Sequence, residues 1–348
     1  MKEAMFYEST SENGVHCNLC NHRCKIKEGK RGICGVRENR GGKLYSFVYG
    51  KIIAEHIDPI EKKPLFNFLP GSRAFSIGTV GCNFHCKHCQ NSDISQYPHE
   101  HGGDVIGQDR NPDQIVTAAK AAGCETIAYT YTEPTIFYEF AYDTAVLARK
   151  EGIKNVFVSN GYMSSEAARQ IAPYLDAINI DLKAFTDKFY KEVCGARLNP
   201  VLETILLMKE LDVWVEVTTL IIPGLNDGEQ ELRDIARFVK SVGTEIPWHV
   251  SQFYPAYKLL NRPSTPVATL RRAREIGMEE GLRYVYEGNV PGEGGENTHC
   301  YGCGALLIER YGLTLTRNRL QDGKCPECGT RIDGLLPTTI RADTHNLR

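Results

Sequence analysis

The sequence lacks long hydrophobic runs and an excess of either charge. No segment approaches the roughly 18 consecutive apolar residues that a membrane helix needs, and residues 1–6 contain no apolar core of a signal peptide. The 41 Lys and Arg residues nearly balance the 43 Asp and Glu residues, which leaves a net charge of −2. We therefore expect a cytoplasmic protein that binds neither a membrane nor a nucleic acid.

Cysteine, in contrast, is abundant. The 348 residues include 13 cysteines, and most of them fall in three tight groups instead of being spread as in a disulfide framework. Clustered thiols in a reducing compartment indicate metal ligands, so the sequence predicts three metal sites. The groups are Cys17, Cys20, Cys24 and Cys34; then Cys82, Cys86 and Cys89; and finally Cys300, Cys303, Cys325 and Cys328.

The middle group has the spacing CxxxCxxC and follows a strand-like run at residues 73–80 that ends in Gly81. Three thiolates can hold three of the four irons of a [4Fe–4S] cluster and leave the fourth iron without a protein ligand. An open iron is a place for chemistry, whereas four ligands would give only an electron carrier. The alternative is a zinc ion, with His85 or His88 as an additional ligand.

The two flanking groups predict different sites. The N-terminal spacing fits neither the two-pair zinc pattern nor the ferredoxin run, so zinc and a second iron–sulfur cluster both remain open, with His16 and His22 as substitute ligands. The C-terminal group consists of two CxxC pairs, each followed by glycine, which is typical of a zinc ribbon. Structural zinc is favoured there, and a rubredoxin-type iron would use the same ligands.

Between residues 73 and 287, short strands alternate with helices six or seven times. This pattern predicts an α/β fold, a partial (β/α)6 TIM-like barrel with small Cys-rich metal-binding segments at both ends. A flavodoxin-like open sheet is the alternative. The expected organisation is a Cys-rich N-terminal metal-binding segment at 1–42, a β-rich connector at 43–72, the core at 73–287, a Gly-rich linker at 288–298 and a zinc-ribbon-like segment at 299–348. We expect a metal to organise residues 1–42, because they are too polar to bury a core.

Polar and charged residues that could bind a ligand follow the predicted strands, at the end where βα barrels carry their active sites. Asp181 is expected to point inward, without a salt bridge to Lys183. Of the two cysteines outside the groups, Cys124 is expected in the core and Cys194 near the barrel mouth, where a redox role is one interpretation. The strand-end residues are Glu133, Asn160, Gly161, Asp181 and Lys183.

Taken in this order, the cysteine loop and the strand-end segments resemble the radical S-adenosylmethionine (radical SAM) superfamily, and more closely its activating-enzyme-like branch. The resemblance covers about residues 73–287 and implies a [4Fe–4S] cluster on Cys82, Cys86 and Cys89. It also implies that SAM is bound by Glu133, by Asn160 and Gly161, and by Asp181 and Lys183. An electron donor of the flavodoxin or ferredoxin type is the implied partner.

The implied activity is cleavage of SAM to a 5′-deoxyadenosyl radical that abstracts hydrogen from a substrate. A glycyl residue of a partner protein is one candidate substrate and a small molecule is the other. The segments at 17–20, 31–37 and 286–289, together with the terminal Cys pairs, are similar to the radical SAM component of the AmmeMemoRadiSam system, a pyruvate formate-lyase activating-enzyme homologue. A non-catalytic multi-metal scaffold is the alternative from a different class.

Overall fold

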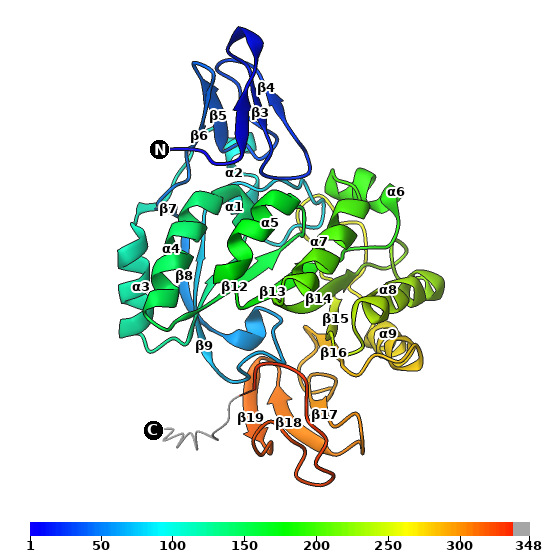
Figure 1. The fold of residues 1–348 in the computed structure, drawn as a ribbon. Helices are drawn as coiled ribbons and strands as arrows, with labels where there is room; N and C mark the ends of the chain where they lie inside the picture. The colour runs from blue at the N-terminus through cyan, green and yellow to red at the C-terminus, as the bar shows by residue number, and fades with distance from the viewer. Residues whose placement is uncertain (337–348) are drawn as a thin grey trace.

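The computed structural model of the protein describes residues 1–336. Residues 337–348, which belong to the predicted C-terminal segment, lie outside the described residues. An eight-stranded sheet forms its centre (Figure 1). The sheet has the order β16-β15-β14-β13-β12-β11-β9-β8, and only the edge strand β8 is antiparallel to its neighbour. Its strands are β8 (Ala54–Pro59), β9 (Arg73–Gly78), β11 (Thr126–Tyr129), β12 (Lys154–Ser159), β13 (Ala177–Asp181), β14 (Trp214–Ile221), β15 (Trp248–Gln252) and β16 (Val285–Gly288).

Helices connect the parallel strands and lie together on one side of the sheet (Figure 1). The predicted alternation of strands and helices is therefore confirmed. Because the strands follow one another in chain order, the sheet is wound in a single direction, unlike a flavodoxin-like sheet, whose order reverses. It does not close into a complete barrel, since β8 and β16 are its two edges. The main helices are α3 (Pro112–Ala121), α4 (Tyr138–Lys150), α5 (Ser165–Ile171), α7 (Asn199–Glu210), α8 (Glu229–Val242) and α9 (Val267–Glu279).

The start of α3 shows how local sequence fixes these boundaries. The Asn111 side chain accepts a hydrogen bond from the Gln114 N–H, and the Gln114 side chain accepts one from the Asn111 N–H, both at 2.9 Å. Pro112 occupies the first helical turn, where a missing N–H costs nothing. Within the described residues, no helix combines the length and the apolar character that crossing a membrane would need.

The N-terminal segment folds into two small antiparallel sheets above the carboxyl ends of the parallel strands (Figure 1). The expectation that it buries no core is wrong: Val15, Leu19, Ile26 and Val36 are buried in the same apolar cluster as the central sheet. Docking against the larger domain supplies the apolar contacts that the segment cannot make alone. One sheet contains β1 (Lys2–Glu3), β5 (Arg37–Arg40) and, from the start of the predicted connector, β6 (Lys43–Ser46). The other contains β2 (Tyr7–Ser9), β3 (Val15–Cys17) and β4 (Lys25–Ile26).

Short elements complete the chain between these larger ones. β7 (Lys51–Ile52) pairs with β10 (Gln108–Asp109). Two short helices, α1 (Ser92–Ser95) and α2 (Tyr97–Glu100), follow the central cysteine loop, and α6 (Asp187–Phe189) follows β13. The C-terminal ribbon contains β17 (Thr298–His299), β18 (Leu306–Tyr311) and β19 (Thr314–Asn318), and it lies at the opposite end of the sheet from the N-terminal segment (Figure 1).

The connector that follows β8 fills the amino-terminal end of the sheet. Leu65 and Phe68 are fully buried in a cluster with small residues from successive strands, among them Ala74, Ala128 and Ala177. Small side chains on these strands leave the space that the larger ones occupy. The C-terminal ribbon adds Arg310, which donates to the backbone oxygen of Phe66 at 2.8 Å and pairs with Glu61 at 3.3 Å.

We predict that Arg310→Ala lowers the free energy of unfolding by about 3–5 kcal/mol, because it leaves the Glu61 carboxylate buried without a compensating charge. Both partners of this pair are fully buried, at 0% exposure. Arg317→Ala is the matched control, since Arg317 pairs with Glu309 on the ribbon surface, and exposed pairs contribute at most about 1 kcal/mol. Urea unfolding followed by circular dichroism measures both variants. Equal losses would contradict a role for the buried pair in joining the ribbon to the connector.

Candidate active site

The loop that follows β9 carries the central cysteines at the carboxyl edge of the sheet. Cys82 and Cys86 are each 8% exposed, and Cys89 is partly buried. The Phe84 N–H lies 3.4 Å from the Cys82 sulfur, and the Cys89 sulfur lies 3.3 Å from the Ser95 hydroxyl. Backbone groups and short side chains thus hold the thiols in place while leaving them available as ligands.

These three thiols are not arranged around one point. Within residues 1–336, no three of Cys82, Cys86, Cys89, His85 and His88 bring their ligand atoms within 4.8 Å of one another. The His85 ring instead contacts the Gln96 side chain at 2.8 Å. Burial, together with Lys183, lowers the pKa of His88 to about 3, so this imidazole is neutral. Within the described residues these side chains thus form no compact set of ligands for one ion, and three thiols on one loop remain the donor set that a [4Fe–4S] cluster would use.

Glu133 lies at the end of β11 with its carboxylate completely buried. One carboxylate oxygen accepts hydrogen bonds from the Thr135 N–H, the Thr135 hydroxyl and the Ser159 hydroxyl at 2.5–3.0 Å. The other accepts from the Asn160 N–H at 2.8 Å. Burial raises the pKa of Glu133, and these hydrogen bonds oppose the rise. Through these hydrogen bonds the Glu133 carboxylate joins the loop that follows β11 to the end of β12.

Asn160 connects this carboxylate to the cysteine loop. Its side-chain amide donates to the Asn83 side chain at 2.8 Å and lies 3.9 Å from the Cys82 sulfur. Gly161 follows with a φ of +70°, and a Cβ there would lie 2.8 Å from the Ile180 side chain. The glycine therefore permits both the left-handed turn and the close approach of β13. Cys82, Asn160 and Glu133 form one continuous hydrogen-bonded group.

Asp181 and Lys183 form a second group beside Cys86. The Lys183 ammonium lies 2.8 Å from the Asp181 carboxylate, so the expectation of no salt bridge is wrong. Residues two apart on an extended chain project to the same face, which brings the two charges together. Burial alone would lower the pKa of Lys183, but Asp181 and the thiols of Cys86 and Cys194 outweigh it, and the pKa lies well above its usual value. A cation therefore lies beside the cysteine loop.

Two contacts at this site involve partners that are remote in the sequence. Cys194 ends a π-helical turn (Tyr190–Cys194) and hydrogen-bonds the Cys86 thiol, which lowers the pKa of Cys86 against the effect of burial. Backbone hydrogen bonds of 2.9 Å join His85 and Lys87 to the last two residues of that turn. The sequence predicts Cys194 near the barrel mouth but gives no sign that it faces Cys86, because no periodic pattern links the two segments.

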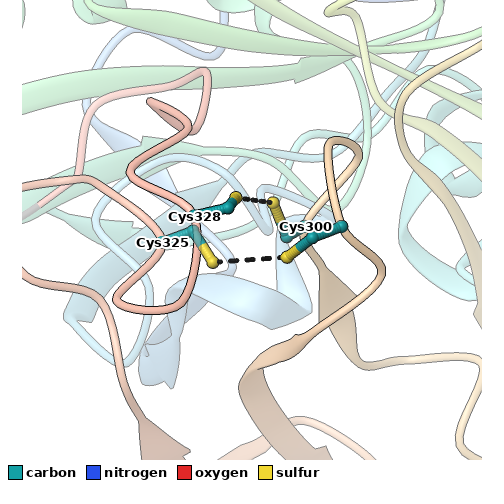
Figure 2. Close-up of side chains that lie close together, drawn as sticks. Cys300, Cys325 and Cys328 are labelled. Carbon is teal, nitrogen blue, oxygen red and sulfur yellow. Dashed lines mark hydrogen bonds between the residues drawn. The ribbon is translucent and has the colours of Figure 1, made fainter.

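The C-terminal cysteines form a different kind of site (Figure 2). All four sulfurs of Cys300, Cys303, Cys325 and Cys328 lie within 4.8 Å of one another, with pairs at 3.6 and 3.7 Å. A tetrahedral ion with metal–sulfur bonds of about 2.3 Å places its sulfurs ~3.8 Å apart. The two CxxC turns thus form a site for one metal ion, and they lie on the ribbon at the far end of the sheet from Cys82.

Comparison with known proteins agrees with the geometry of the central loop. A family described as the Radical SAM superfamily matches residues 76–239. The chain belongs to the radical SAM superfamily. It is 50% identical to the uncharacterized protein MJ0808 of Methanocaldococcus jannaschii over 97% of this chain and the whole of that protein.

The pyruvate formate-lyase 1-activating enzyme of Escherichia coli K12 is 23% identical to this radical SAM protein over 52% of this chain and 75% of that enzyme. Among solved structures, SuiB of Streptococcus suis, bound to S-adenosylmethionine, matches 66% of this chain and 52% of its own with a TM-score of 0.50 and 14% identity, which shows a shared fold. The chain is therefore a radical SAM enzyme related to glycyl-radical activating enzymes. Membership in this superfamily implies a [4Fe–4S] cluster and SAM, and the donor set Cys82, Cys86 and Cys89 fits the cluster.

We predict that Gly81→Ala disturbs the cysteine loop more than a comparable change elsewhere. Gly81 has a φ of +96°, and a Cβ there would lie 2.6 Å from the Val36 side chain and 3.0 Å from the Cys34 carbonyl oxygen. Gly123→Ala is the control, because Gly123 has a φ of +64° and open space around it.

Both substitutions carry the cost of a left-handed alanine, roughly 1–2 kcal/mol, and only Gly81→Ala adds crowding of about 1–3 kcal/mol. Unfolding free energies of the two variants check the difference. If Gly81→Ala is no more destabilised than Gly123→Ala, the N-terminal segment does not press on the cysteine loop.

Proposed function

We propose that this radical SAM enzyme holds a [4Fe–4S] cluster on Cys82, Cys86 and Cys89 and uses it to cleave SAM reductively. The observation that carries the proposal is the CxxxCxxC spacing of three thiols, two buried and one partly buried, on one loop at the carboxyl edge of parallel strands. When bound, the reduced cluster would supply one electron that splits SAM into methionine and a 5′-deoxyadenosyl radical, which abstracts hydrogen from a substrate. The open sheet would serve as a partial (β/α)6 barrel around this chemistry.

The chain's own residues would position and shield the reactants. Glu133 and Asn160 fix the Cys82 side of the loop, and the Lys183 ammonium supplies positive charge on the Cys86 side. We propose that SAM contacts Glu133, Asn160 and Gly161 on one side and Asp181 and Lys183 on the other. These residues follow neighbouring strands, so one ligand could reach both groups. The burial of the site would keep water away from a carbon radical.

For the substrate, we propose a glycyl residue of a partner protein, with a small molecule as the alternative. Two features support a protein: the relation to glycyl-radical activating enzymes and the absence, within residues 1–336, of pairing between the edge strands β8 and β16. An open side gives a polypeptide loop access that a closed barrel would deny. An electron donor of the flavodoxin or ferredoxin type and a reducing compartment such as the cytoplasm complete the proposal. The flanking motifs support assignment to the AmmeMemoRadiSam branch.

We predict that alanine at Cys82, Cys86 or Cys89 abolishes SAM cleavage, because each substitution removes an iron ligand. Formation of 5′-deoxyadenosine by anaerobically reconstituted, dithionite-reduced protein is the measurement. Cys124→Ala is the control: Cys124 is buried but lies before β11, at the amino end of the strands, and this variant should keep the unmodified rate. A variant lacking one of the three ligands that still forms 5′-deoxyadenosine at full rate would contradict the proposal, and a colourless protein containing only zinc would favour a scaffold.

For the C-terminal site we propose zinc with a structural role. Cys303→Ser should reduce bound zinc from about one ion per chain to none and lower the thermal midpoint, because metal binding there is coupled to folding. Cys303 is exposed, so its replacement removes little packing. Glu327→Gln, between Cys325 and Cys328, should retain the metal. Elemental analysis and thermal melting measure both variants. Stoichiometric iron in place of zinc would contradict the metal assignment, and loss of SAM cleavage by a folded Cys303→Ser variant would contradict the structural role.

A further inference from the structure

The N-terminal cysteines line a cavity between the N-terminal segment and the short 3₁₀ helix (Pro134–Phe137) that precedes α4. Cys17, Cys20, Cys24 and Cys34 all contribute to its wall, together with apolar side chains such as Leu19 and Ile136. Cys17 and Cys34 are buried, and the other two are partly buried. All four thiols are free of disulfides. Four thiols facing an apolar cavity form a set of metal ligands that water reaches poorly.

The sulfur positions do not suit a single ion. Within the described residues, only the C-terminal group gathers three or more ligand atoms within 4.8 Å, so no three of these four thiols are that close. The same chain thus contains two four-cysteine sets of different size. The compact set has the dimensions of a tetrahedral zinc site, whereas the wider set would suit a group with several metal atoms, which its sulfurs could bind separately.

Arg37 supplies a second, independent observation. Arg37 is one of the residues that line the cavity and is only 2% exposed, and its Nε has no hydrogen-bond partner. The other end of the guanidinium is satisfied by Glu139 at 2.9 Å and by the Met5 carbonyl at 2.7 Å. A buried donor without a partner is costly, so an unpartnered Nε on a residue of the cavity wall favours an acceptor at this place. Sulfur atoms of an anionic cluster could accept this hydrogen bond.

The cavity adjoins the active site. A Cβ built on Gly81 would lie 3.0 Å from the Cys34 carbonyl oxygen, so the two cysteine loops touch. The His22 ring, which also lines the cavity, contacts the Asn83 carbonyl oxygen at 2.7 Å. Thr135 lies on the cavity wall and hydrogen-bonds Glu133. Residues of the cavity wall, such as Cys34 and His22, therefore contact the central cysteine loop directly, and a metal centre in the cavity would lie next to that loop.

We propose that Cys17, Cys20, Cys24 and Cys34 bind a second iron–sulfur cluster. The four thiolates would be the ligands of its irons, so that no iron lacks a protein ligand. Such a cluster has no iron open to a substrate, so it would carry electrons and would not bind SAM. The assignment of a cluster to these thiols does not depend on the reaction at the central loop. A role in passing electrons to that loop rests on the proposed function.

The test uses the full chain, reconstituted without oxygen from iron and sulfide. In the triple variant Cys82→Ala, Cys86→Ala, Cys89→Ala, the central site is lost, and we expect the protein to remain brown and to retain about four irons per chain, or about two if the second cluster is [2Fe–2S]. Adding Cys17→Ser and Cys34→Ser should remove that remaining iron and leave C-terminal metal unchanged. Iron, zinc and acid-labile sulfide are counted, and Mössbauer spectra identify the cluster.

The unmodified chain gives a reading that does not depend on the folding of a variant. Two cubane clusters predict about eight irons per chain and two spectroscopic environments. A single environment with about four irons, together with two zinc ions per chain, would overturn the proposal. So would a folded triple variant without iron. Failure of SAM cleavage in the unmodified protein would count against the proposed function alone, because retention of iron by the triple variant does not depend on that reaction.

Discussion

The parallel register of the central sheet is the constraint on which the site depends. Because β9, β11, β12 and β13 run in the same direction, their carboxyl ends share one edge, and the loops that leave them meet there. Cys82, Glu133, Asn160 and Asp181 are far apart in the chain and become neighbours only through this register. An antiparallel strand at any of these places would send its loop to the opposite end of the sheet.

The two ends of the sheet contain different structures. The carboxyl end contains the central cysteine loop, and the N-terminal segment covers it through contacts such as the buried pair of Arg37 and Glu139. The amino end is filled by the connector and closed by the ribbon through Arg310. The Glu216 carboxylate, buried at this end, accepts hydrogen bonds from two backbone N–H groups and from Trp214, and it contacts His249.

Much of this arrangement could be predicted from the sequence because its causes are local. Strand and helix periods, the capping box at Asn111 and the CxxxCxxC spacing all act over a few residues. The docking of residues 1–42 could not be predicted, since its apolar contacts become useful only when the larger domain is present. The contact between Cys194 and Cys86 likewise depends on tertiary packing. The missed pair of Asp181 and Lys183 is different, because the period of an extended chain would have indicated it.

The number of cysteines does not distinguish the N-terminal group from the C-terminal group, but the distances between their sulfurs do. Two groups have four thiols, and spacing along the chain leaves the N-terminal one ambiguous. In three dimensions the C-terminal sulfurs gather at the separation that one tetrahedral ion requires, while the other two groups stay wider. Since a cluster binds each thiolate through a different iron, its ligands must stand apart. The C-terminal sulfurs therefore match one tetrahedral ion, and of the other two groups only the central one, with three thiols, would leave an iron of a cluster open to SAM.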